Sequence, residues 1–139
     1  MIIVDTNLLS EAMRERPEPG VATWLDQQPK TEMFTTAVTK AEILYGIAIS
    51  PLGQKRAARE TAAESIFSGP FSGRILPFED DAAIHYAQIA ALRRSRGREM
   101  QEADAQIAAI TRLHGATLAT RNISDFEDCG IRLVNPWEA

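Results

Sequence analysis

Short apolar segments alternate along the whole chain with longer segments that carry apolar residues at helical spacing. Several of the short segments are mostly β-branched or aliphatic and lack polar alternation, which is typical of strands covered on both faces of a sheet. Glycine and proline stand where helix ends are expected. The pattern predicts five strands, at Ile2–Asp5, Met33–Thr36, Arg74–Phe78, Thr117–Thr120 and Ile131–Val134.

Six helical segments are predicted between or beside these strands. Strands that alternate with helices form a mainly parallel sheet with helices on both faces and right-handed crossovers. We therefore expect an α/β fold, and because no linker or repeat interrupts the pattern, we expect residues 1–139 to form one domain. The predicted helices are "LLSEAMRE", "VATWLDQQ", "KAEILYGIAIS", "QKRAARETAAESIFS", "DDAAIHYAQIAALRRSR" and "EADAQIAAITRLHG".

Composition narrows the class of protein. With 45% hydrophobic residues, the 139-residue chain can bury a sizeable core. It has no apolar run long enough to span a membrane and no secretory signal, so we expect a cytoplasmic protein. Cys129 is the only cysteine, which excludes an intramolecular disulfide and a cysteine-based zinc cage. The net charge of −4 argues against a large nucleic-acid-coating surface but is compatible with a small basic groove.

The first predicted strand ends in a carboxylate, Asp5. A buried strand gains nothing from this charge, because an ionised carboxylate resists leaving water unless something pairs with it. Asp5 can cap the helix that follows. Alternatively, it can hold a metal ion, since α/β sheets bind ligands at the carboxyl ends of their strands. Its position alone does not decide between the two interpretations.

Three further acids lie where this fold could bring them near Asp5. Glu42 follows the second strand on a helix, although Thr39-x-x-Glu42 also has the spacing of a capping box. Asp104 lies beside the apolar stripe of its helix, where a carboxylate needs a partner. Asp125 lies in "NISDFED" after the fourth strand, where such residues also cap or turn the chain.

A cluster of these acids would require a cation. Two carboxylates about 5 Å apart repel by about 3 kcal/mol at an effective dielectric constant of about 20. No lysine or histidine recurs at the other strand ends to neutralise them. Because Mg²⁺ and Mn²⁺ prefer hard oxygen ligands, the four acids together predict a site for one of these ions.

Six segments, in order, cover nearly the whole chain: "IIVDTNLLSE", "TTAVTKAEILYGI", "ILPFEDDAAIHYAQIAALRR", "EADAQIAAI", "LATRNISDF" and "LVNPW". Their order and spacing resemble those of PIN-domain proteins, and specifically of the VapC- and FitB-like toxin nucleases of bacterial toxin–antitoxin pairs. The resemblance implies a three-layer α/β/α fold whose parallel five-stranded sheet has the order 3-2-1-4-5. It also implies Mg²⁺- or Mn²⁺-dependent endoribonuclease activity, restrained by a small antitoxin of the VapB or FitA type.

The resemblance also implies the site residues. It assigns metal binding and catalysis to Asp5, Glu42, Asp104 and Asp125. The fourth position differs among relatives, and this chain has Asn122 at one of the two places and Asp125 at the other. We favour Asp125 as the fourth carboxylate, with Asn122 beside it. The hydroxyls of Thr6 and Thr120 are expected to orient the acids.

Three other functions compete with this interpretation. An aspartyl-nucleophile phosphatase needs a second aspartate where this chain has Asn7. A phospho-receiver domain needs a lysine after the fifth strand, where this chain reads "NPWEA". The third alternative is a catalytically silent PIN fold that only binds RNA or a partner. The intact acids count against it. A metal-binding titration separates the two, because a silent scaffold should show no acid-dependent Mn²⁺ site.

Partners are predicted from charge and from apolar surface. Arginines are concentrated at 93–98, and we expect Arg94, Arg96 and Arg121 to contact the RNA backbone, although a solvated helix end also explains the run. An antitoxin could inhibit by inserting an arginine among the metal-free acids, as the resemblance also implies. A homodimer is expected from the resemblance and from the apolar side chains Trp24, Leu25, Tyr86 and Ile89.

Overall fold

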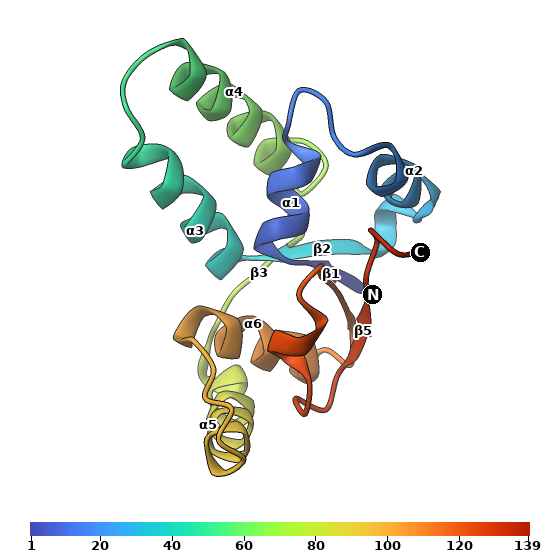
Figure 1. Cartoon of the computed structure of the whole chain (residues 1–139), viewed down its shortest axis with the longest axis vertical. Coiled ribbons are helices and arrows are strands. Elements are labelled where there is room, and N and C mark those ends of the chain that lie inside the picture. Colours follow the sequence, from blue (N-terminus) through green and yellow to red (C-terminus); the bar gives the residue numbers. More distant parts are fainter.

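The computed structural model describes all 139 residues and contains one five-stranded sheet (Figure 1). Every strand pair is parallel, and the strand order is β3-β2-β1-β4-β5. The predicted topology is therefore confirmed. The strands are β1 (Ile2–Val4), β2 (Met33–Thr36), β3 (Ile75–Leu76), β4 (Thr117–Ala119) and β5 (Arg132–Val134).

The two central strands end one residue earlier than predicted, and this places polar side chains at the sheet edge. β1 ends at Val4 and β4 at Ala119, which are paired in register. Asp5 and Thr120 therefore leave neighbouring strands at the same level. Backbone hydrogen bonds still hold both residues: Asp5 N donates to Ala119 O at 3.2 Å, and Thr120 N donates to Val134 O at 2.9 Å.

All six segments predicted to be helical are helices, with shifted ends. The helix predicted from Lys40 begins three residues earlier, at Ala37, because the Thr36 hydroxyl accepts a hydrogen bond from Thr39 N at 3.0 Å. No helix is both long and apolar enough to cross a bilayer. The elements are α1 (Thr6–Ala12), α2 (Pro19–Gln27), η1 (Lys30–Glu32), α3 (Ala37–Ala48), α4 (Gln54–Ser68), α5 (Asp80–Ser95), α6 (Glu102–Leu113) and η2 (Ile123–Phe126).

Helices cover both faces of the sheet, because alternate side chains of a strand point to opposite faces. Ile3 and Leu118 are buried in a core beneath α5 and α6. Their neighbours Val4 and Ala119 are buried in a second core, beneath α1 to α4. Figure 1 shows α5 and α6 on one side of the sheet and α1, α3 and α4 on the other. Full burial of each large aliphatic side chain contributes about 1.5–3 kcal/mol.

The apolar side chains that motivated the homodimer pack within the chain. Ile89 is 1% exposed and lies in the core beneath α5 and α6. Trp24 and Leu25 pack against the other core. Tyr86 meets Phe78 edge to face, with ring centroids 5.9 Å apart. Ile89 is therefore not available for a dimer contact, whereas Trp24, Leu25 and Tyr86 are half-buried. The large exposed apolar side chains are Met1, Leu44, Tyr45, Ile49, Leu52, Ile84 and Leu92.

Candidate active site

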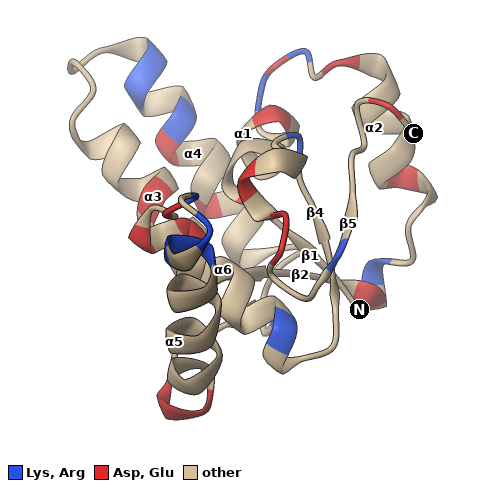
Figure 2. Cartoon of the chain, turned by 60° about the horizontal axis from the view of Figure 1, so that its bottom comes forward, with Lys and Arg blue, Asp and Glu red and all other residues tan.

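The predicted acids come from segments that meet at the carboxyl edge of the sheet. β1 has β2 on one side and β4 on the other, so the strand order reverses at this point, where open α/β sheets bind ligands. Asp5 follows β1, Glu42 lies on α3 after β2, and Asp125 lies in η2 after β4. Asp104 lies in the first turn of α6. Figure 2 shows the basic end of α5 next to acidic segments.

Asp5 is both a helix cap and a candidate ligand. Its Oδ1 accepts a hydrogen bond from Leu8 N at 2.9 Å, which caps α1, and the residue is only 4% exposed. Burial raises the pKa of Asp5, and the nearby Glu42 charge raises it further, while the Thr120 hydroxyl and the Leu8 amide lower it. Capping occupies one oxygen, so the two interpretations of Asp5 are compatible.

Glu42 does not form the capping box that its spacing allowed. Thr39 lies inside α3, and the residue that caps this helix is Thr36. The capping-box alternative for Glu42 is therefore wrong. Instead, Glu42 Oε1 accepts a hydrogen bond from Thr6 Oγ1 at 2.6 Å. This contact joins α3 to the start of α1 and orients one carboxylate with a hydroxyl, as predicted for Thr6.

Asp104 shows that carboxylates from separate elements lie close together. Burial is the largest cause and, together with the charges of Asp125, Glu42 and Asp5 in that order, raises the pKa of Asp104 to about 6. The guanidinium of Arg93 acts in the opposite direction. The half-buried position beside the apolar face of α6 agrees with the sequence pattern.

The loop after β4 places Asp125 and Asn122 differently. Asp125 is exposed in η2, and its charge acts on Asp104. Asn122 N donates to Thr120 Oγ1 at 3.0 Å, and Asn122 lines a pocket beside α1. Thr120 thus links Asn122 to Asp5, because its hydroxyl also lies at the Asp5 carboxylate.

The donor set fits a hard divalent cation by its chemistry. All four acids offer carboxylate oxygens, the ligands that Mg²⁺ and Mn²⁺ prefer. As the side chains stand, no group of three or more His, Cys, Asp or Glu residues is arranged to hold a metal ion. Mutual repulsion keeps ionised carboxylates apart when no cation lies between them. Binding an ion would therefore require the side chains to move together, which the positive charge favours.

The arginine run at the end of α5 is not a simple solvated helix end. Arg93 is only 5% exposed, and its guanidinium donates to backbone carbonyls. Arg96 pairs with Asp128 at 3.1 Å, and Arg98 donates to the Glu127 carboxylate at 3.1 Å. The charge of Arg96, which we predicted to contact RNA, is therefore already engaged. Among the arginines of this run, Arg94 is exposed and forms no ion pair.

Sequence reasoning missed the burial of Arg93, although a signal was present. The buried residues of α5 are Ala82, Ile89 and Arg93, spaced seven and then four residues apart. Such spacing defines one stripe of a helix. An arginine that continues an apolar stripe is thus placed for burial, with its guanidinium directed to polar partners at the helix end.

A pocket of about 590 Å³ lies between α1 and the loop after β4; none of the four acids lines it, but Asn7 in its wall lies two residues after Asp5. The guanidinium of Arg121 lies over the Trp137 ring, 5.3 Å from its centroid. Such stacking holds a cation in place without neutralising it. The pocket is lined by Asn7, Ser10, Glu11, Arg14, Arg121, Asn122 and Trp137.

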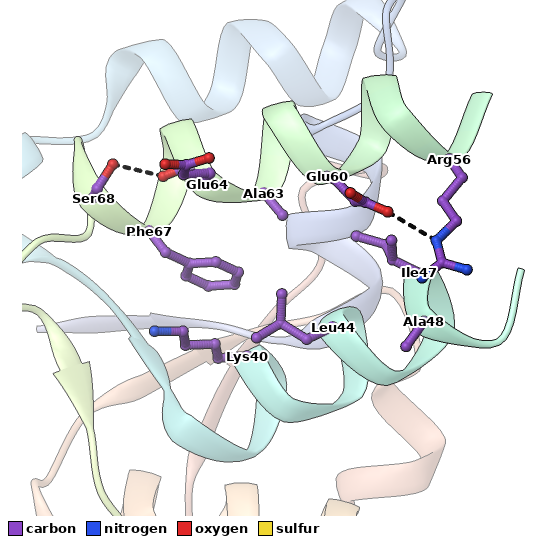
Figure 3. A pocket seen from close by; sticks show the side chains of 10 residues that line it. All are labelled: Lys40, Leu44, Ile47, Ala48, Arg56, Glu60, Ala63, Glu64, Phe67 and Ser68. Atoms are coloured by element: carbon purple, nitrogen blue, oxygen red, sulfur yellow. Dashed lines mark hydrogen bonds and ion pairs between the residues drawn. The ribbon is translucent and has the colours of Figure 1, made fainter. Parts of the chain in front are cut away.

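A separate groove of about 520 Å³ runs between α3 and α4 (Figure 3). Figure 3 shows Lys40 and Leu44 on one wall and Phe67 on the other. Arg56 and Glu60 pair on α4 at 2.8 Å. None of the four predicted acids lines this groove, so the candidate active site lies at the sheet edge and not here.

The family of the chain is established by comparison with known proteins. The PIN domain family matches residues 2–130. The parallel sheet of order 3-2-1-4-5 and the acids at its carboxyl edge agree with this match. The chain belongs to the PIN-domain family.

Within this family the chain is similar to VapC- and FitB-like toxins, which confirms the resemblance seen in the motifs. It is 37% identical over 138 residues to VapC ribonuclease Y4jK of Sinorhizobium fredii, covering 99% of both chains. It is 36% identical over 137 residues to Toxin FitB of Neisseria gonorrhoeae, again covering 99% of both. A solved structure of FitAB bound to an IR36 DNA fragment aligns with a TM-score of 0.91 at 36% identity, over 99% of this chain and 96% of that chain.

Proposed function

We propose that the protein is a Mg²⁺- or Mn²⁺-dependent endoribonuclease toxin of a bacterial toxin–antitoxin pair. The observation that carries the proposal is the convergence of Asp125, Glu42 and Asp5 on Asp104, whose raised pKa reflects their charges as well as burial. Four carboxylates that repel one another are unfavourable for folding alone, so a cation-binding role accounts for them. The similarity to a VapC ribonuclease and to Toxin FitB supports the same activity.

In this proposal the chain's own residues hold the ion and the RNA. The ion would bind to Asp5, Glu42, Asp104 and Asp125. When bound, it would lower the pKa of a coordinated water and neutralise charge on the scissile phosphate. Thr6 and Thr120 would keep their carboxylates oriented, since Thr6 donates to Glu42 and the Thr120 hydroxyl lies at Asp5.

RNA would approach across the pocket between α1 and the loop after β4. Arg121 is exposed there and stacks on Trp137, and no carboxylate pairs with it. A cation in this position can attract a phosphate of the RNA backbone. Arg94 is the second available cation, whereas Arg96 would have to exchange Asp128 for phosphate. Of the three arginines predicted to bind RNA, Arg121 therefore has the strongest support.

Restraint by an antitoxin is part of the same proposal. The similarity to FitAB supports a small VapB- or FitA-like partner. The metal-free acids would accept a guanidinium in charge-assisted hydrogen bonds, so an inserted arginine would occupy the place of the ion. A homodimer also remains a proposal, and the exposed side chains Tyr45, Ile49 and Leu52 are available for such a contact.

Cleavage of a single-stranded RNA in Mg²⁺ and in chelator tests the proposal. Asp104→Asn should abolish cleavage while leaving the fold intact. Glu102→Gln is the matched control, because Glu102 is exposed in the same turn of α6, and its activity should equal that of the wild type. If the purified wild type bound Mn²⁺ weakly and identically to Asp104→Asn, the silent binding module would be the better description.

A further inference from the structure

Arg93 is a buried cation that no carboxylate pairs with. It is 5% exposed, and none of the ion pairs of the chain includes it. Its Nε donates to Arg98 O at 2.8 Å, and its Nη1 donates to Glu127 O at 2.8 Å and lies 3.4 Å from Ser124 O. A buried charge is unfavourable unless it is hydrogen-bonded, so these carbonyls are the groups that retain it.

Arg93 contacts the loop after β4, and this loop is held in shape by contacts with other elements. It contains a single 3-10 turn, in which Asp125 N donates to Asn122 O at 3.1 Å. Asp128 follows with a φ of 63°, which is uncommon for a residue other than glycine. Such a conformation persists when the surroundings hold it. Arg98 adds a second contact, since its Nη2 donates to Ser124 O at 2.8 Å.

These contacts fix the chain on both sides of Asp125. On one side, the Ser124 carbonyl is held by Arg93 and Arg98. On the other side, Phe126 is 3% exposed and is buried in the core beneath α5 and α6. The Asp125 backbone is therefore held between two fixed neighbours, on a turn that packs against α6, where Asp104 lies.

We propose that Arg93 is a positioning residue for the metal site: by holding the Ser124 and Glu127 carbonyls, it keeps the Asp125 carboxylate next to Asp104. This inference rests on the proposed function, because it takes Asp125 as a metal ligand. Arg93 touches neither ion nor RNA in this account and acts through the loop. Its charge has a second effect, since it lowers the pKa of Asp104 and so opposes the repulsion among the acids.

The test is Mn²⁺ affinity of the full chain without RNA, measured by calorimetry. Arg93→Met should weaken Mn²⁺ binding about tenfold or more, the usual effect of losing a partner that orients metal ligands. Arg93→Lys should also weaken it, because an ammonium keeps the charge but cannot span both carbonyls. The control is Arg132→Met: Arg132 also donates to a backbone carbonyl, Gly115 O at 3.0 Å, but at the opposite edge of the sheet. Its affinity should stay unchanged.

A double-mutant cycle separates positioning from general damage to the fold. Asp125→Asn alone should weaken Mn²⁺ binding, and Arg93→Met should add little once Asp125 has been replaced. Independent, additive losses would overturn the positioning role. Wild-type affinity in Arg93→Met together with weakened affinity in Asp125→Asn would overturn the positioning role of Arg93 but not the assignment of Asp125 as a metal ligand. Unchanged affinity in Asp125→Asn would overturn the ligand assignment in the proposed function, and the positioning role with it.

A second variant, at a more exposed residue, tests the proposal if Arg93→Met does not fold. If circular dichroism shows that Arg93→Met is unfolded, Arg98→Ala removes the second contact to Ser124 from a more exposed position. This variant should weaken Mn²⁺ binding severalfold, and amide hydrogen exchange at residues 122–128 should become faster. Wild-type affinity and exchange in Arg98→Ala would contradict the proposal.

Discussion

Replacing Asp104 by asparagine should stabilise the metal-free protein at neutral pH. Burial and the neighbouring acids raise the pKa of Asp104 from 3.8 to about 6. A rise of about two units corresponds to about 3 kcal/mol, at 1.36 kcal/mol per unit. Because Asp104 is only half-buried, solvent screening reduces the expected gain in unfolding free energy to about 1–2 kcal/mol.

The gain in unfolding free energy should increase as the pH rises. The pKa is higher in the folded state than in the unfolded state, so the wild type takes up a proton on folding between about pH 4 and pH 6. This contribution to stability is fully present below about pH 4 and is lost as the pH rises through about 6. The asparagine variant has no such loss. The difference in unfolding free energy should therefore grow from near zero at about pH 4 to its full value at about pH 7.

Urea unfolding in the presence of chelator, between about pH 4 and pH 8, measures this difference. Glu102→Gln serves as the control and should follow the wild type, since Glu102 is exposed in the same turn. Mn²⁺ at about a hundred times its Kd should add about 2.7 kcal/mol to the wild type and much less to Asp104→Asn. Equal stability of the two proteins, or a difference that does not change with pH, would contradict a raised pKa of Asp104 in the folded protein.

Three further predictions follow from single contacts. Thr36→Ala should lower the unfolding free energy by about 0.5–2 kcal/mol in urea titrations through loss of the cap of α3, in addition to the loss of a buried methyl group, whereas Thr36→Ser should lose only the methyl contribution, about 1 kcal/mol. Thr6→Val should reduce RNA cleavage about 10- to 100-fold with little change in stability, because Glu42 loses its orienting hydroxyl. Arg121→Ala should flatten the slope of log affinity for single-stranded RNA against log salt by about 0.7, measured in Ca²⁺; an unchanged slope would mean that Arg121 contacts no phosphate.

Local patterns were sufficient to predict the five strands, the six α-helices and the acid that follows β1. The apolar run before Asp5 forms β1, so the acid at the sheet edge was visible in the sequence, although the strand ends at Val4, one residue before the predicted end. The order of the strands was not visible in the sequence, because periodicity does not say which strands are neighbours. That order came from the resemblance, and the parallel pairing of β1 with β2 and β4 agrees with it.

The errors have physical causes that a local pattern does not show. Thr36 and Thr39 can both cap a helix in the sequence, but β2 ends at Thr36, which leaves Thr36 as the cap and Thr39 inside α3. Pairing with β3 decides where β2 ends. Arg93 contacts carbonyls about thirty residues away, so only the assembled fold shows its partners. The prediction that Ile89 lies on a dimer surface fails because amphipathic spacing does not distinguish burial within a chain from burial between chains.

In the proposed function, Asp5, Glu42, Asp104 and Asp125 share one metal centre. Anomalous diffraction from crystals grown with Mn²⁺ tests it most directly. We expect an anomalous peak at the carboxyl ends of β1 and β4, about 2.0–2.3 Å from oxygens of at least Asp5 and Asp104. Asp104→Asn crystals grown in the same way should lose the peak. A protein that cleaves RNA in Mn²⁺ while its only ordered Mn²⁺ lies away from these carboxylates would contradict the account.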